Sequence, residues 1–318
     1  MLLRRLGASL LLLYLVLTTT FFLIHLAPGD PTALFDNPRV PQAQRERLKE
    51  LYGLDRPLPE QYGRWLAAVA RGDWGSSFLY GRPVTAVLAE AFPRTALLGV
   101  SAILVEYAAA LALGLAAARR AGSRADHLIR LGSLAFYAMP VFWLGLMAIL
   151  LFGYLWPVLP AGEMRSVGAE ELPAAARLLD YLRHLLLPAL VVGLSAAGGT
   201  ARFVRNSLLE VLSQDYIRTA RAKGLSERRV LWAHGMRNAL VPLTQLFAVS
   251  LPVLLNGSLV AEVVFSWPGL GRLTAGAIFA RDYPVIIAAT AFSGVLVVLG
   301  NLLADVLLGV VDPRVRDA

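Results

Sequence analysis

Long apolar runs alternate with polar, arginine-rich segments along this chain. The first run, residues 6–27, contains 22 residues. As an α-helix it would rise about 33 Å, which is enough to cross the hydrocarbon core of a bilayer. Five further runs lie at residues 96–118, 131–156, 185–203, 240–264 and 285–311. The pattern predicts an all-α integral membrane protein with six transmembrane helices.

The polar segments divide the chain into four parts. We expect an N-terminal transmembrane helix over residues 1–29, an extracytoplasmic segment over 30–94, a transmembrane domain over 95–311 and a tail over 312–318. A cleaved signal peptide is the alternative for the first run. No Ala-x-Ala site follows that run, and a Pro-Gly-Asp-Pro sequence ends it instead, so a retained span is favoured.

Segment 30–94 carries nine basic and eight acidic residues and is therefore nearly neutral. Its turn-rich sequences contain the aromatic residues Trp65, Trp74 and Phe78. We expect these rings to anchor a small helical subdomain against the outer ends of the spans. A mobile linker is the alternative.

Two of the predicted spans have unusual compositions. Pro140 lies inside the third span and should kink it, because proline removes a backbone donor. The second half of the fourth span, residues 193–201, consists almost wholly of small residues. Small residues let helix backbones approach closely in lipid. We therefore expect this helix to pack tightly against its neighbours.

The distribution of charge predicts the orientation. Of the 318 residues 57% are hydrophobic and 16% charged, against about 25% charged in soluble domains, and the net charge is +8. The N-terminus, the 119–130 loop, the 205–237 loop and the C-terminus carry the arginine excess, and six spans place them on one side. The positive-inside rule makes that side, with both termini, cytoplasmic. Membrane topology rather than nucleic-acid binding explains the basic charge.

The polar stretch 215–242 has its own helix signals. Asp215 can cap a helix, Gly224 can end it in the left-handed conformation, and Ser226 can cap a second helix that runs toward Pro242. The stretch predicts a short helix, a tight turn and another helix outside the bilayer, where a partner could move it. A solvated basic loop is the alternative.

Catalytic motifs are missing from the sequence. There is no phosphate-binding loop and no His-Glu-x-x-His, the four histidines are scattered, and there are no cysteines. A Gly-Leu-Ser-Ala-Ala sequence at 193–197 lacks the last glycine of a serine hydrolase motif. We therefore expect neither an enzyme nor a cofactor.

Two acidic residues, Glu106 and Asp305, lie within predicted spans. Acids in spans are functional candidates by default. A proton-coupled secondary transporter that uses both residues is the alternative function. Against it, no inverted repeat is visible, and Asp305 can instead pair with an arginine such as Arg130 near the cytoplasmic end.

The sequence resembles the membrane subunits of bacterial ABC importers, and in particular the B-type permeases of the dipeptide, oligopeptide and nickel subfamily. In the coupling loop, residues 206–239, the family signature is Glu-Ala-Ala, three residues, then Gly. The aligned residues here are Arg218, Thr219, Ala220 and Gly224, so the Glu and the first Ala are replaced. Further matching motifs lie at residues 26–31, 53–58, 72–78, 264–271, 281–284, 301–305 and 312–316.

The resemblance implies a type I importer permease fold in a bacterial or archaeal plasma membrane. A coupling helix over residues 216–223 would sit in a groove of a cytoplasmic ATPase. The implied coupling residues are Asp215, Tyr216, Arg218, Thr219, Ala220, Arg221, Ala222, Lys223 and Gly224, with the alanines and glycine allowing close approach. Candidates for the pathway or gate are Glu106, Asn256, Glu262, Trp267, Pro268 and Gly269.

The implied partners are a second homologous permease, two ATPase subunits, an extracytoplasmic substrate-binding protein and the lipid bilayer, with no nucleic acid. ATP hydrolysis would take place on the ATPase subunits. Peptides are the favoured substrate, and a nickel complex, glutathione or a sugar derivative stay open because the binding protein selects the substrate.

The predicted orientation can be tested by labelling single cysteines, since the chain contains none of its own. Cysteines placed in residues 30–94 should react with an impermeant maleimide added outside, and cysteines in 206–239 should react only from the cytoplasmic side. Cytoplasmic labelling of the 30–94 segment would contradict the topology.

Overall fold

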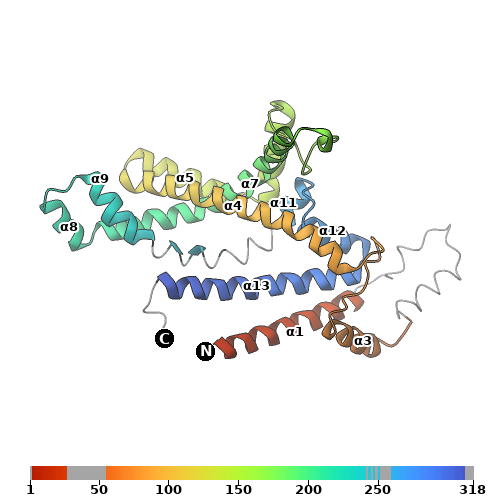
Figure 1. Cartoon of the computed structure of the whole chain (residues 1–318). Coiled ribbons are helices and arrows are strands. Elements are labelled where there is room, and N and C mark those ends of the chain that lie inside the picture. The colour runs from red at the N-terminus through yellow and green to blue at the C-terminus, as the bar shows by residue number, and fades with distance from the viewer. Residues whose placement is uncertain are drawn as a thin grey trace. The chain divides into compact units, whose positions relative to one another are not determined.

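The computed structural model describes residues 2–26, 55–240, 243–244, 246–247, 250 and 259–311, with side chains between residues 7 and 303. The described part is helical, and its only extended pairing is one isolated bridge between Ser76 and Pro83. Its elements are α1 (Leu2–Leu26), α3 (Leu58–Ala70), α4 (Val84–Arg119), α5 (Arg124–Ala138), α6 (Val141–Ala148), the π-helix η2 (Ile149–Leu155), the 3-10 helix η3 (Ala169–Glu171), α7 (Ala174–Leu212), α8 (Asp215–Ala222), α9 (Glu227–Arg229), the π-helix η4 (Val230–Met236), α11 (Leu259–Val264), α12 (Leu270–Ala280) and α13 (Tyr283–Val311) (Figure 1).

Four of the described helices are long and apolar enough to cross a bilayer: residues 7–26 of α1, all of α4 and α7, and residues 283–303 of α13. The pair formed by α5 and the α6–η2 stretch would be a fifth span. Most of the predicted fifth span, residues 240–264, lies outside the described residues. The all-α membrane fold is confirmed, with four or five of the expected six spans visible in the described part.

The third predicted span is broken rather than kinked. Helix α5 ends at Ala138, α6 begins after Pro140, and the two helices are bent by 101°. Met139 adopts an extended conformation (φ −77°, ψ 134°). The ring of a proline disfavours the helical conformation of the residue before it, so the chain leaves the helix at Met139. The bend that the sequence predicts at Pro140 is confirmed, but it separates two helices and does not lie within one helix over 131–156.

Contacts divide the chain into two compact units, residues 1–94 with 269–298 and residues 95–268 with 299–318. In the first unit, α3 packs on α1 and on the first turns of α13. Leu17 and Phe21 of α1 form a buried cluster with Ile287 of α13, and the aromatic rings of α3 cover it. The ring centroids of Phe21 and Trp65 lie 5.2 Å apart. The described part of segment 30–94 is therefore folded against apolar helices, as expected.

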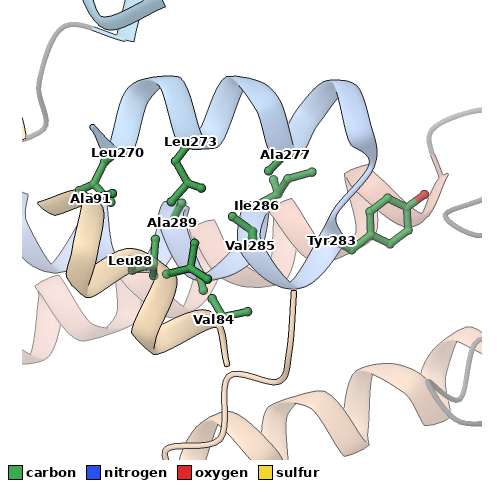
Figure 2. Close-up of a cluster of buried hydrophobic side chains, with 12 residues drawn as sticks. Val84, Leu88, Ala91, Leu270, Leu273, Ala277, Tyr283, Val285, Ile286 and Ala289 are labelled. Carbon is green, nitrogen blue, oxygen red and sulfur yellow. The ribbon is translucent and has the colours of Figure 1, made fainter. Parts of the chain in front are cut away.

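A second cluster in the same unit joins α4, α12 and α13. Figure 2 shows Val84 and Leu88 of α4 facing Leu273 of α12 and Val285 of α13. The side chains of Trp74 and Phe78 pack against this cluster. All three predicted aromatic anchors thus lie against apolar cores.

A buried hydrogen-bond network ties two of the sequence motifs together. Asp282, which is fully buried, accepts hydrogen bonds from Ser77 Oγ at 2.5 Å and from the Leu79 amide at 3.0 Å. Its other oxygen lies 3.4 Å from the Val285 amide at the start of α13. The turn before α4 is therefore held on the corner between α12 and α13.

In the second unit, α5 lies along α7, and α7 also packs closely on α4. A Cβ added to Gly193 would lie 2.7 Å from the Ala102 carbonyl oxygen of α4. One added to Gly198 would lie 2.1 Å from the Ser133 carbonyl oxygen of α5. Only glycine permits these distances, so the small residues of the fourth span allow the close packing that the sequence predicts.

The Asp282 network should contribute measurably to stability. Asp282→Ala should lower the Tm of the detergent-solubilised protein. Each buried donor left without an acceptor typically costs about 1–3 kcal/mol. Asp73→Ala is the matched control, because the hydrogen bond that Asp73 accepts from the Gly75 amide is exposed to solvent. Equal Tm values for the two variants would contradict this role.

Candidate functional site

The predicted coupling segment folds into a small helical unit built around an apolar cluster. Ile217 and Ala220 of α8 contact Val230 of η4, and Leu212 and Leu225 pack around them. Ile217 and Val230 are fully buried, and Ala220 is 6% exposed. This cluster holds the short helix α8, which at eight residues would be marginal in water by itself.

The helix begins differently from the prediction. Gln214, in an extended conformation (φ −73°, ψ 152°), is the capping residue, and its carbonyl accepts a hydrogen bond from the Ile217 amide at 3.0 Å. Asp215 is the first helical residue and makes no capping bond. Because it lies in the first turn, its charge still favours the helix dipole. The proposed capping role of Asp215 is therefore wrong.

The helix ends as predicted. Gly224 has φ +80°, in the left-handed region. Its amide donates to the Arg221 carbonyl at 2.9 Å, and the Leu225 amide lies 3.4 Å from the Ala220 carbonyl. These two bonds, together with the apolar contact of Leu225, form a Schellman motif. A turn of this kind reverses the chain at once and returns it toward α7.

Two polar contacts fix the orientation of α8. Arg221 donates from Nε and Nη2 to the two carboxylate oxygens of Glu227, at 2.8 and 3.3 Å. At the other end, Asn238 Nδ2 donates to the Tyr216 hydroxyl at 3.1 Å. Ser226 takes the N-cap position of α9 in an extended conformation, as expected, although its side chain makes no capping bond.

The exposed face of α8 is polar and basic. Of the predicted coupling residues, the exposed ones are Asp215, Tyr216, Arg218, Thr219, Arg221, Ala222, Lys223 and Gly224. Ala220 instead points inward, because it follows the buried Ile217 by three residues on the same helix face. The structure corrects the expectation that Ala220 faces a partner, since its small side chain fits the internal cluster.

An open hollow of about 440 Å³ lies on α9 and η4, lined by Ser226, Arg228, Arg229, Trp232 and Ala233. The indole of Trp232 is 54% exposed. The basic residues and the exposed ring form a basic, partly apolar surface on α9 and η4. This surface is chemically suited to a protein partner with acidic and apolar groups.

The unit is continuous with α7, since only Ser213 and Gln214 separate the two helices. Leu208 of α7 packs on Leu231 and Met236 of η4. The Ser207 hydroxyl donates to the Ala239 carbonyl at 3.1 Å. Helix α8 is therefore joined to α7 through packed side chains and one short connection.

An ion pair not anticipated from the sequence anchors α7 near this unit. Arg205 donates from Nε and Nη2 to the two oxygens of Asp126 in α5, at 2.7 and 2.6 Å. Asp126 is 2% exposed and also accepts from the Gly122 amide at 3.0 Å. The Asp126 amide donates to Ser123 Oγ at the start of α5. The sequence signal available for Asp126 was the Ser-x-x-Asp spacing. That spacing indicates the start of a helix, but it does not identify Arg205 on α7 as the partner of Asp126.

Two of the predicted pathway residues, Glu106 and Glu262, lie inside the packing of the second unit. Glu106 of α4 is 5% exposed and accepts from Thr200 Oγ1 of α7 at 2.6 Å. Glu262 of α11 is fully buried and accepts from Thr95 Oγ1 at 2.7 Å. Both acids thus join helices. Asn256 and the side chain of Asp305 lie outside the described residues, so the suggested contact with Arg130 stays a prediction.

Trp267 is also fully buried, against Leu98, Leu185 and Ala189. Its amide donates to the Glu262 carbonyl at 2.8 Å. Pro268 follows it, and Gly269 is the residue before α12. The tryptophan fixes the turn after α11 and does not line an open surface.

No group of three metal-ligating side chains occurs among the described residues.

Comparisons with known proteins cover nearly the whole chain. Residues 110–317 match the model of the family described as "Binding-protein-dependent transport system inner membrane component". Residues 1–99 match the N-terminal family that accompanies it.

Several relatives align over nearly their full length. The oligopeptide transport system permease protein AppB of Bacillus subtilis is 40% identical, over 98% of both chains. The di/tripeptide transport system permease protein DppB of Pseudomonas aeruginosa is 38% identical, over 98% of this chain and 97% of its own. The dipeptide transport system permease protein DppB of Escherichia coli K12 is 36% identical, over 99% and 98%.

Proposed function

The chain belongs to the family of binding-protein-dependent transport system inner membrane components, and on that premise we propose that it forms half of the translocation pathway of an ATP-driven peptide importer. Members of this family are transport permeases, so the chain is a multi-pass inner membrane protein and not an enzyme. The observation that carries the proposal is the full-length similarity to an oligopeptide permease, at 40% identity.

Helix α8 is the proposed contact with a cytoplasmic ATPase. Its exposed residues, from Asp215 to Lys223, are polar or small, and its buried residues bind it to η4. A helix fixed in this way moves as one body with the end of α7. ATP-driven closure of the ATPases would push α8, and α7 would carry that movement into the membrane.

Partner subunits of three kinds complete the proposed importer. A second, homologous permease supplies the other half of the pathway, and two ATPase subunits hydrolyse ATP. A substrate-binding protein delivers peptide on the extracytoplasmic side, where residues 30–94 help to dock it. In this arrangement both termini and the coupling loop face the cytoplasm.

The proton-coupled alternative has less support. Glu106 is engaged by Thr200 between two packed helices, which is a structural use of a span carboxylate. The relatives named above are permease proteins of peptide transport systems, and their full-length similarity favours the importer.

Substitutions on α8 test the coupling role. Ala222→Glu adds a charge on the exposed face, and Gly224→Val strains the turn by about 1–2 kcal/mol, because a side chain at φ +80° meets its own backbone. Both variants should insert in the membrane, retain less ATPase on co-purification and lose peptide uptake in proteoliposomes that contain all subunits.

Gly168→Val is the matched control for Gly224→Val. Gly168 has φ +79°, and, as at Gly224, an added Cβ would meet no atom within 4 Å. The control therefore has the same local strain away from α8 and should keep its ATPase. Normal uptake and ATPase retention in both α8 variants would rule out coupling through α8.

A further inference from the structure

Two buried polar atoms on α5 and α7 lack a hydrogen-bond partner. Across the described residues, the buried side-chain nitrogen and oxygen atoms without a partner are Ser133 Oγ and Arg202 Nε. Ser133 lies on α5 against Gly198 of α7, and Arg202 follows Gly198 by one helical turn. Both atoms therefore belong to the same α5–α7 seam. Buried polar groups are rarely left unpaired, and those in a native structure call for an explanation.

The guanidinium of Arg202 reaches into the span and not toward its cytoplasmic end. Its Cζ lies 5.1 Å from the ring centroid of Tyr137. That ring lies beside Gly199, where an added Cβ would be 3.2 Å from Tyr137 Cε2. Because helical side chains tilt toward the helix N-terminus, Arg202 extends back along α7, away from the coupling helix.

The charge of Arg202 has no counter-ion among the described residues. Arg205, three residues further along α7, does have a counter-ion, because it forms a two-point ion pair with Asp126. Arginines in membrane spans are costly, and they usually face a bundle interior or an aqueous pathway. The ring of Tyr137 is 57% exposed, so one side of this arginine–tyrosine pair is open.

The geometry points to the Arg202–Tyr137 pair as a carboxylate-binding site on the translocation pathway, which holds the C-terminal carboxylate of the transported peptide. This inference rests on the proposed function as a peptide importer. A guanidinium is the side chain best matched to a carboxylate. The cation–π contact with Tyr137 keeps the guanidinium in place while the site is empty.

The position of the site connects it to the ATPase cycle. Arg202 lies on α7, which leads into α8 after Leu212. A carboxylate held by Arg202 is thus held by the helix that the proposed ATPase contact moves. Closure of the ATPases would displace the site and release the peptide toward the cytoplasm. The permease would then contribute to substrate selection together with the binding protein.

The experiment uses the complete importer in proteoliposomes with radiolabelled trialanine. Arg202→Gln should reduce trialanine uptake by about tenfold or more, since a hydrogen bond to a charged group is lost. Arg202→Lys should retain an intermediate rate, because the charge remains without the fork geometry. Co-purification of both permeases and the ATPases should be unchanged in both variants.

Photo-crosslinking identifies the carboxylate that occupies the site. Benzoylphenylalanine in place of Tyr137 should form an adduct with labelled trialanine, and the adduct should disappear when Arg202→Gln is added. Phe136, the adjacent residue and 46% exposed, is the matched control position and should give no peptide adduct. An adduct at position 137 with the second permease instead of the peptide would overturn the inference and assign the carboxylate to that subunit.

The outcomes separate this inference from the proposed function. Normal trialanine uptake by Arg202→Gln would reject the carboxylate site while the importer function stands. Failure of the unmodified complex to import trialanine or any other di- or tripeptide offered would reject peptide import itself, and with it the inference.

Discussion

The close packing of α7 is the constraint on which the second unit depends. At Gly193 and Gly198 the backbone of α7 approaches α4 and α5 so nearly that a Cβ would collide with carbonyl oxygens. In a bilayer, where lipid tails are as apolar as leucine, helix association relies on such contacts and on hydrogen bonds. The hydrogen bonds from Thr200 to Glu106 and from Arg205 to Asp126 supply the polar contacts between the same helix and its neighbours.

This packing suits α7 to the proposed coupling as well as to crossing the membrane. The helix continues for a total of 39 residues and ends only two residues before α8. The apolar cluster around Ile217 and Val230, the Arg221–Glu227 pair and the Tyr216–Asn238 contact bind α8 to the chain that returns to α7. A rigid unit at the end of a rigid helix is suited to transmit movement, because packed elements shift together and do not deform gradually.

The first unit has a different kind of anchor. Asp282 is fully buried and connects the turn before α4 with the corner between α12 and α13. Segments more than two hundred positions apart thus form one folded body. The same unit contains the aromatic residues of α3 packed on α1. Segment 30–94, in its described part, is therefore a structured surface and not a linker.

The sequence by itself determined the membrane class, four of the long apolar helices and the helix–turn–helix over residues 215–236. These features follow from local rules: the length of apolar runs, the small residues of the fourth span and the need for glycine at φ +80° at position 224. Only the tertiary structure decided which residues meet. It placed Ala220 inside, broke the third span at Met139, paired Arg205 with Asp126 and left Arg202 beside Tyr137 without a counter-ion among the described residues. Such pairings depend on the rotation and register of whole helices against one another, and no local pattern of residues specifies these.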